Sequence, residues 1–591
     1  GGGKRLIGYV VPEGPVDAAE LRSFMRGRLP DYMVPAVFMT VDGLPLTANG
    51  KVDRKALPEP DPVTAAGVEY VPPRTANEVV LAGIWSQVLG VERVGLHDNF
   101  FELGGDSILS LQIVARARAA GLRLDVADVF ARQSVGELAA AVRLTATPVL
   151  AEQGTVSGSV LLTPIQHWFV EQDIADRDHW NWSGMFELAQ GADASALARA
   201  VDAVIRHHDA LRIRFAYDPA RQAWVQHNAP AEEGEVFSVV DAVGMGEAQV
   251  AERMTVAQTS LSLADGPLIR VVHFDRGEEP GWLGITVHHL VMDGVSWNVL
   301  LEDLDSAYRG ESLPAKTTSF QQWAERLHAF AGTERVREQL PYWTQQLDST
   351  FMVPVDDAAG ANTEASSEIV RATLDAETTS ALLTRAHKAY RTQINDVLLA
   401  GLLQALGEWA GTDAVTIDLE SHGREAIAEE VDLSRTLGWF TSIYPVTLSS
   451  DDLSEPGRVL KSVKEQLRSS PDRGVGYGAL RYLTGELGQV ASPQVLFNYG
   501  GAFDAAGDDE VGLLARELSP ELYGPSEGQE QTRSHLLQVE VSQTADGEMA
   551  FEWYFSTNVH RPETIQRVAE SYVRALRALV EHCLSPGAGG F

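Results

Sequence analysis

Two adjacent histidines and a nearby aspartate form the most chemical stretch of the chain. His288, His289 and Asp293 lie within ITVHHLVMDGVSW, at the end of the apolar run WLGITV. If this run is a strand, the two histidines point to opposite faces of it, so one can do chemistry while the other is packed. General acid–base catalysis needs only one imidazole with a pKa near neutrality and access to a cleft, whereas zinc would need more ligands at a recognised spacing. The pattern therefore favours acid–base work or a structural pair over a metal site.

Ser107 is the second candidate, because FFELGGDSILSL displays it behind two glycines at the start of an apolar helical pattern. A hydrolase nucleophile sits in a G-x-S-x-G turn after a strand, but Leu109 stands at the second glycine position and a loop precedes the serine. The pattern leaves a helix-capping serine or a serine that is modified. The preceding Asp106 has a plain explanation as a helix N-cap, worth about 1 kcal/mol over alanine.

The overall composition limits the compartment and the partners of the chain. It has 591 residues, a formal net charge of -35 and a single cysteine, Cys583. So negative a surface would attract neither nucleic acid nor an anionic membrane, and one cysteine excludes an internal disulfide framework and a multi-cysteine zinc site. No charged-then-apolar leader opens the sequence, and no apolar run reaches about 18 residues. We expect a cytoplasmic protein without nucleic-acid, membrane or metal partners.

Proline-rich and polar stretches divide the sequence into units. PEPDPVTAAGVEYVPPR (58–74) and TATPVLAEQGTVSGS (145–159) lack helical periodicity and are typical of linkers, and a softer break lies near 330–365. We therefore expect a first segment at residues 1–58, linkers at 59–74 and 144–159, a small unit at 75–143, and a large unit at 160–585 whose lobes cover about 160–340 and 341–585.

The elements that must position these residues differ between the units. In the small unit, a capping box from Thr75 to Glu78 opens the first helix, and further helices are predicted from Ser107, over about 125–131 and after Ser134. Four helices in about 70 residues leave little concave surface, so this unit presents a substrate rather than transforms it. The large unit alternates helices such as DASALARAVDAVIRHHDAL with strands such as WLGITVHH and AVTIDLE, which predicts a two-lobed α/β fold with a cleft.

The stretch DNFFELGGDSILSLQ inside a four-helix unit resembles the carrier (thiolation) domain of nonribosomal peptide synthetases. In that family the serine that matches Ser107 carries a 4'-phosphopantetheine arm, attached by a phosphopantetheinyl transferase. The unpaired N–H groups and the positive dipole end of a helix N-terminus would stabilise its phosphodiester by about 0.3–1 kcal/mol. An aspartate before that serine, here Asp106, accompanies carriers paired with an epimerization domain, so the resemblance implies a partner-recognition contact.

The stretch LPDYMVPAVFMTVDGLPLTANGKVDRKALPEP resembles the end of the small C-terminal lobe of an adenylation domain. Lys51 in NGK matches the lysine that contacts the substrate carboxylate and phosphate in that family. The larger core lobe and its phosphate loop are missing from the sequence, so Lys51 has no active site to complete. We expect this small α+β remnant to be silent here, and the resemblance implies an upstream adenylation core as a partner.

The stretch ITVHHLVMDGVSW matches the H-H-x-x-x-D-G motif of the condensation-domain superfamily, which includes chloramphenicol acetyltransferase-like folds. The resemblance implies that His289 faces a channel between two lobes and that Asp293 is structural and pairs with an arginine. Arg212 in RHHDALRIRF is the matching candidate, and removal of either partner would leave a buried charge. The doublet His207–His208 lacks this context and is expected on the helix surface.

Six further motifs occur in order along the large unit: LTPIQHWF, NDVLLAGLLQALGEW, ESHGREAI, RTLGWFTSIYPV, PDRGVGYGALRYL and VLFNYGG. Together they resemble the motif series of epimerization domains rather than that of ordinary condensation domains. The resemblance implies that Glu420 of ESHGRE enters the cleft and works with His289. Burial would raise the pKa of Glu420 and the nearby Arg424 would lower it, and the sequence does not decide between them. Asn498 and Tyr499 match polar residues near the site, with strand-end packing as the alternative.

These resemblances predict a carrier–epimerization didomain. It would remove and return the α-proton of an aminoacyl or peptidyl thioester held on the Ser107 arm, through an enolate, and move it towards an L/D mixture. Glu420 would act as one acid–base group, and His289 as the other or as an enolate stabiliser. The carrier would dock on its own epimerization domain, and a downstream condensation domain would accept the D-thioester. The alternatives are a condensation-type acyltransferase that uses His289 and a catalytically silent docking scaffold.

Overall fold

The structure is a computed structural model of the chain. It describes residues 7–10, 37–40, 71–91, 93–100, 103, 105, 107–124, 128–129, 132–144, 151–230, 236–349, 351–425, 427–428, 430–488, 490–500, 512–544, 546–585 and 587–589. Lys51 and Asp106 lie outside the described residues, and of Ser107 only the main chain is described. The chain divides into two compact units, Gly1–Leu103 with Arg116–Arg143 and Gly104–Ala115 with Leu144–Phe591.

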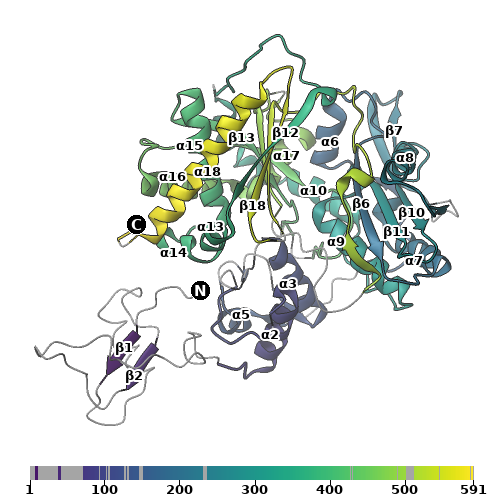
Figure 1. Ribbon diagram of the computed structural model, residues 1–591, viewed down its shortest axis with the longest axis horizontal. Coiled ribbons are helices and arrows are strands. Elements are labelled where there is room, and N and C mark those ends of the chain that lie inside the picture. Colours follow the sequence, from purple (N-terminus) through teal and green to yellow (C-terminus); the bar gives the residue numbers. More distant parts are fainter. Residues whose placement is uncertain are drawn as a thin grey trace, which may run out of the picture. The chain divides into compact units, whose positions relative to one another are not determined.

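The first 150 residues contain short strands and the helices of the small unit. Strands β1 (Ile7–Val10) and β2 (Val37–Thr40) pair in parallel. Helix α2 begins with the capping box that the sequence predicts, because Thr75 Oγ1 accepts the N–H of Glu78 and Glu78 Oε2 accepts the N–H of Thr75. Of the helix expected over about 125–131, only residues 128–129 are described, and they are helical. The remaining elements are α2 (Ala76–Leu89), α3 (Ser107–Ala119), β3 (Leu122–Arg123), α5 (Val135–Ala141) and β4 (Arg143–Leu144) (Figure 1).

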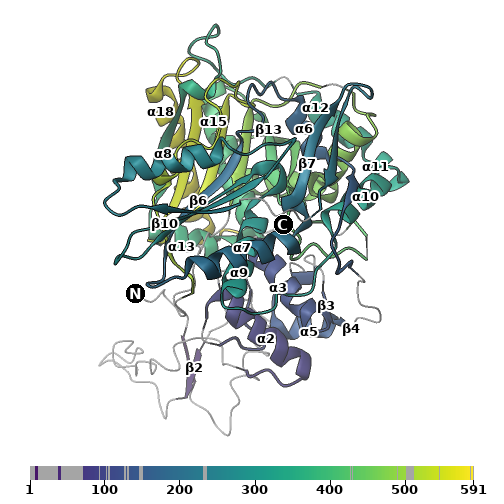
Figure 2. The ribbon, with the colours of Figure 1, turned by 90° about the vertical axis from the view of Figure 1, so that its right-hand side faces the viewer.

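The first lobe of the large domain is built on a five-stranded sheet, of which Figure 2 labels strands β6 and β10. The order of its strands is β16-β6-β11-β10-β9. On one face Phe186 stacks on Trp297 of α9, and on the other Gly284 leaves room for Met254 of α8. Strand β11 is therefore buried on both faces, which explains its unbroken apolar run. The elements are β6 (Asn181–Leu188), α7 (Ala194–His207), β9 (Phe237–Asp241), α8 (Glu247–Gln258), β10 (Ile269–Asp275), β11 (Trp282–His288) and α9 (Gly294–Tyr308).

The second lobe is built on a six-stranded sheet with the order β12-β18-β17-β15-β13-β14. Helices cover one face of it, where Phe551 and Trp553 contact Tyr572 of α18 (Figure 1). Strands β17 and β18 alternate buried apolar residues with half-buried, mainly polar ones, so polar side chains gather on the opposite face. The elements are β12 (Ser367–Leu374), α15 (Ile394–Ala410), β13 (Ala414–Ser421), β14 (Ser442–Ser449), α16 (Pro456–Ser469), β15 (Val495–Tyr499), β17 (Leu537–Gln543), β18 (Met549–Ser556) and α18 (Pro562–Leu584).

The two lobes share one continuous apolar core, which confirms the expected two-lobed α/β fold. Strand β16 (Leu514–Glu517) follows β15 in the sequence but pairs with β6, so the chain crosses back to the first sheet. Among the described residues, no helix has both the length and the hydropathy to span a bilayer. Other elements are the small sheet of β5 (Gly158–Val160), β8 (Ala223–Asn228) and β7 (Ile213–Asp218), and the helices α6 (Pro164–Glu171), α10 (Phe320–Ala331), α11 (Glu334–Arg337), α12 (Leu340–Leu347), α13 (Ala376–Ala381), α14 (His387–Tyr390) and α17 (Val475–Gly478) with its continuation Ala479–Leu483.

Candidate active site

His288 ends strand β11 and is fully buried. Its Nε2 lies 2.7 Å from the main-chain oxygen of Arg177, and its Nδ1 accepts the N–H of Leu290 at 3.1 Å. Burial lowers the pKa of His288 to about 4. Because both nitrogens are hydrogen-bonded and the ring is neutral near pH 7, this histidine is a structural group of the strand end.

His289 opens the turn that follows, and its ring contacts two tryptophans. The ring centroids lie 5.5 Å from Trp182 and 4.4 Å from Trp439. The residue is partly exposed, and its Nδ1 has no hydrogen bond of good geometry to the described residues. Burial lowers the pKa of His289, while main-chain groups of His289 and Met292 and the charge of Asp293 oppose this effect. A partly exposed imidazole that is neutral near pH 7 can accept a proton from a substrate.

Asp293 is the N-cap of helix α9 and anchors a neighbouring loop. Its Oδ2 accepts the N–H of Phe440 at 3.1 Å, and its Oδ1 lies 3.1 Å from Nη2 of Arg424, in a pair with both side chains buried. Nη1 of Arg424 donates to two main-chain oxygens within residues 433–436, at 2.6 and 2.9 Å. The pair therefore ties the start of α9 to the loop that leads into β14.

The prediction that Arg212 pairs with Asp293 is wrong. Arg212 lies in the turn after α7 (Asp209–Arg212), where its guanidinium donates to main-chain oxygens at 2.7–3.3 Å. The carboxylate whose charge acts on Arg212 is Asp209, its neighbour in that turn. Arg424 takes the role instead, because the fold brings it to Asp293 across 131 positions of sequence.

The expectation that His207–His208 lies on the helix surface is wrong for His208, while His207 ends α7 and is partly exposed. His208 is buried, and its Nε2 lies 2.8 Å from Oδ2 of Asp303, whose Oδ1 accepts Nη2 of Arg435 at 2.6 Å. Among the described residues, His207, His208 and Asp303 form the group whose possible metal-ligand atoms lie within 4.8 Å of one another. The guanidinium of Arg435 already neutralises this carboxylate, so the cluster is a buried ion-pair network between α7, α9 and the loop before β14.

Glu420 lies near the end of β13, on the polar face of the six-stranded sheet. Burial, together with the negative charges of Glu540 and Asp418, raises the pKa of Glu420 to about 8. Arg424 is four positions away in the sequence, but its guanidinium is turned to Asp293 and is not among the charges that act on Glu420. Of the two influences expected from the sequence, burial therefore prevails.

Glu420 belongs to a polar row that crosses four strands. The parallel register of β13 and β15 brings Asn498 to the level of Glu420, Asn498 pairs with Glu540 of β17, and Glu540 pairs with Glu552 of β18. The amide of Asn498 donates to Glu540 Oε2 at 3.0 Å, and that of Gln538 donates to Oε1 at 2.8 Å. Burial raises the pKa of Glu540 as well, while the two amide donors oppose this effect and favour the ionised form that acts as an anionic neighbour of Glu420.

Sequence reasoning missed Glu540 and Asp418. Asp418 lies two residues before Glu420 on the same face of β13, with Oδ2 3.0 Å from Nε2 of His535. Strand alternation places both carboxylates on the polar face, but only the order of the strands shows that they flank Glu420. Tyr499 is half-buried and packs against the shared core at the end of β15.

Ser107 is the first residue of α3, a helix of 13 residues. A phosphodiester attached there would lie at the positive end of the helix dipole, which favours an anion, so the position fits a phosphopantetheine arm. The roles expected for Asp106 in partner recognition and for Lys51 in an adenylation lobe stay predictions, because both residues lie outside the described part of the chain.

The two-lobed fold, with a histidine after a buried strand and a buried Asp–Arg pair behind it, defines a condensation-type domain. Residues 156–588 match the Condensation domain family, residues 79–142 match the Phosphopantetheine attachment site family, and residues 2–51 match the AMP-binding enzyme C-terminal domain family. The middle domain is thus a carrier that holds phosphopantetheine covalently on a serine.

The chain belongs to the nonribosomal peptide synthetase family. It is 45% identical over 620 residues to a component of the linear gramicidin synthase of Brevibacillus parabrevis, an alignment that covers 100% of this chain and 8% of that protein. It is 38% identical over 602 residues to surfactin synthase subunit 1 of Bacillus subtilis (strain 168), over 99% of this chain and 16% of that protein. The chain therefore spans only a small part of the length of these relatives.

Solved structures place the large domain within this family more closely. The epimerization domain from the third module of tyrocidine synthetase B matches with a TM-score of 0.67 and 34% identity, over 73% of this chain and 98% of that one. The first condensation domain of the CDA synthetase matches with a TM-score of 0.51 and 18% identity, over 72% of this chain and 97% of that one, and shares the fold. The chain thus combines a carrier domain with a condensation-family domain that is similar to an epimerization domain.

Proposed function

We propose that the chain is a carrier–epimerization didomain that inverts the α-carbon of an aminoacyl or peptidyl thioester held on an arm at Ser107. The observation that carries this proposal is the raised pKa of Glu420, about 8, in a domain that also presents a neutral imidazole at His289. Trp439, which contacts His289, and Ile443, which pairs with Glu420, line the same cavity. Amide-bond formation that uses His289 has no step for Glu420 and its raised pKa, whereas epimerization needs a second acid–base group.

The shifted pKa values define which group holds the proton at rest. Near pH 7 Glu420 is protonated and His289 is neutral. His289 takes the α-proton, and the C–H electron pair becomes part of an enolate whose negative charge rests on the thioester oxygen. Glu420 then donates its proton to the opposite face of the α-carbon, and the carbonyl reforms. The pair is left as protonated His289 and ionised Glu420, which is the form that the reverse direction requires.

Proton exchange at the α-carbon tests this proposal directly. A phosphopantetheinyl transferase loads the full chain from L-phenylalanyl-coenzyme A in deuterated water, and the released amino acid is analysed by chiral chromatography and mass spectrometry. We expect D-phenylalanine that carries deuterium at the α-carbon. Glu420→Gln should slow exchange by about 10²–10⁴-fold, the usual contribution of a general acid–base, while Ser107→Ala should prevent loading.

A control separates catalysis from the loss of any buried carboxyl. Asp396 on α15 is also a buried acid, with a pKa raised to about 6 by burial, and it caps its own helix rather than lining the cavity. Asp396→Asn should therefore keep the wild-type exchange rate. If Glu420→Gln exchanges at the full rate, its assigned role is wrong. Dipeptide formation with a loaded acceptor carrier would support a condensation-type acyltransferase, and a folded chain that does neither would support a docking scaffold.

The proposal implies partners on both sides of the chain. An adenylation core would select and activate the amino acid, a phosphopantetheinyl transferase would modify Ser107, and a downstream condensation domain would accept the D-thioester. The carrier would dock on its own epimerization domain, with Asp106 as a recognition contact. Asp106→His should then slow epimerization while leaving the attachment of phosphopantetheine unchanged, as measured by the mass of the holo chain.

A further inference from the structure

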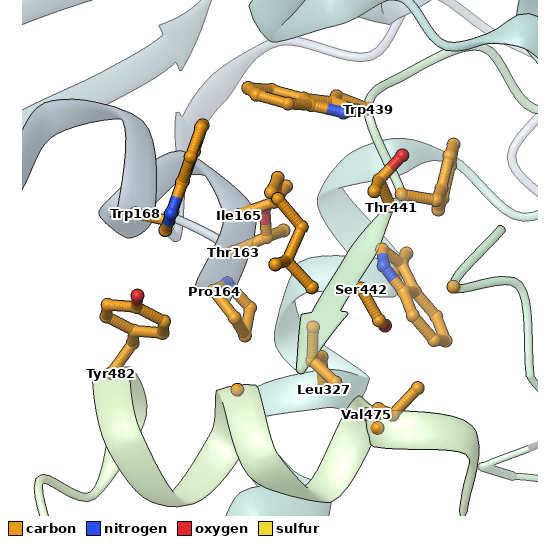
Figure 3. Close-up of a pocket in the computed structure, with 16 residues that line it drawn as sticks. Thr163, Pro164, Ile165, Trp168, Leu327, Trp439, Thr441, Ser442, Val475 and Tyr482 are labelled. Atoms are coloured by element: carbon orange, nitrogen blue, oxygen red, sulfur yellow. The ribbon is translucent and has the colours of Figure 1, made fainter. Parts of the chain in front are cut away.

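An uncharged cavity lies in the large domain (Figure 3). It is partly open, and its empty space of about 460 Å³ includes space that is continuous with solvent. Its walls come from the start of α6, from α10, from the loop into β14, and from α17. Sixteen residues line it, none of them carries a charge, and the aromatic ones are Trp168, Trp323, Trp439, Phe440 and Tyr482.

The cavity reaches both sides of the proposed reaction centre. Trp439 forms part of its wall and contacts the ring of His289, with centroids 4.4 Å apart. Ile443 forms another part and is the cross-strand neighbour of Glu420, so the two side chains share one face of the sheet. If the α-carbon of the substrate lies between His289 and Glu420, its side chain would therefore point towards this cavity.

One polar group of the wall has no partner among the described residues. The indole N–H of Trp439 is buried and makes no hydrogen bond to them. Buried donors of this kind are normally satisfied, so an unpaired donor in a cavity wall indicates a ligand that supplies an acceptor. A carbonyl oxygen of a bound acyl chain is such an acceptor, and it brings no charge into the apolar space.

We infer that this cavity is the side-chain pocket of the epimerization site and that it selects thioesters whose α-carbon carries an apolar side chain. This inference rests on the proposed function and names its substrate class. A charged side chain would lose its hydration without finding a counter-ion in the wall, so it is excluded. A small side chain fits but leaves the aromatic walls without contact.

Substrate competition on the full chain tests this inference. Holo protein is loaded in turn with L-phenylalanyl, L-leucyl, L-alanyl, L-aspartyl and L-lysyl groups, and deuterium exchange at the α-carbon is followed for each. We expect phenylalanyl and leucyl groups to exchange at least about tenfold faster than aspartyl and lysyl groups. Equal rates for all five groups would overturn the pocket and leave the epimerase intact, whereas no exchange even for L-alanine would contradict the proposed function itself.

A cavity-filling variant locates the selectivity in these walls. Val475 of α17 lines the cavity and is buried, so Val475→Phe should slow exchange of the phenylalanyl group by about tenfold or more and that of the alanyl group by less than about threefold. Val355→Phe, at an exposed position outside the cavity, is the matched control and should leave both rates unchanged. An equal effect of Val475→Phe on both substrates would contradict the assignment.

A binding measurement keeps the inference testable if no exchange is seen. Tryptophan fluorescence reports on the cavity, because three of its wall residues are tryptophans. Titration with the pantetheine thioester of N-acetyl-L-phenylalanine should change the emission at lower concentration than the corresponding L-aspartate thioester, and Val475→Phe should remove this difference. Equal affinities for the two thioesters would overturn the pocket whatever reaction the domain performs.

Discussion

Replacement of Glu420 by glutamine should stabilise the large domain while it removes activity. Burial and the charges of Glu540 and Asp418 raise the pKa of Glu420 from an ordinary value of 4.5 to about 8 in the folded chain. Between these two values, the folded side chain keeps a proton that the unfolded side chain has released. Folding then takes up a proton, so the free energy of unfolding of the wild type falls as the pH rises from 4.5 to about 8.

The size of the effect follows from the pKa shift. Each pH unit within this window costs about 1.4 kcal/mol, so the interval from 4.5 to pH 7 corresponds to about 3 kcal/mol as an upper limit. Glu420 keeps some contact with solvent, which screens part of this cost. We expect Glu420→Gln to raise the free energy of unfolding by about 1–3 kcal/mol at pH 7 and by almost nothing at pH 4.5, because glutamine does not ionise.

Guanidinium unfolding followed by tryptophan fluorescence measures this change. Trp85 lies in the carrier and the other eleven of the twelve tryptophans lie in the large domain, so the signal reports mainly on that domain. Asp396→Asn is the matched control: its pKa is raised only to about 6, so its gain should be complete by pH 6, whereas the gain from Glu420→Gln should grow up to about pH 8. A Glu420→Gln variant that is less stable at every pH, or whose gain does not change with pH, would refute the assignment of a protonated carboxyl.

Two further predictions concern the effect of Glu540 on Glu420 and the buried pair of Asp293 and Arg424. In both directions of the reaction, His289 and Glu420 together hold one exchangeable proton, so the exchange rate should decline above a pH of about 8. Glu540→Gln removes a charge that raises the pKa of Glu420 and should therefore move this decline to lower pH. If the decline in the pH–rate profile does not move, Glu540 does not act on the site. Arg424→Lys should lower the free energy of unfolding by about 2–4 kcal/mol, because lysine does not reproduce the contacts of the buried guanidinium. Arg561→Lys, at a pair with Asp356 in which the arginine is exposed, should lower the free energy of unfolding much less, and similar losses for both variants would contradict the buried-pair argument.

Structural features that depend only on neighbouring positions can be predicted from the sequence. The capping box at Thr75 and Glu78, the start of a helix at Ser107 and the buried strand before His288 all follow from the spacing of side chains over a few residues. The two-lobed fold was predictable as well, because alternating helices and strands with these motifs leave few other arrangements. The sequence also indicates Glu420 as a candidate acid–base residue, but it does not show whether the side chain is protonated.

What the tertiary structure alone decided is which residues meet. Arg424, not Arg212, pairs with Asp293, and His208 turns inward to Asp303, because partner choice depends on contacts between elements far apart in the chain. Strand order sets the rest. Only the order β13-β15-β17 brings Glu540 into the row of Glu420, and a shift of one residue in that register would turn its side chain to the opposite face. The sequence by itself therefore determined the reactive groups of this protein, and the fold determined their neighbours, on which burial and charge, and with them the pKa of Glu420, depend.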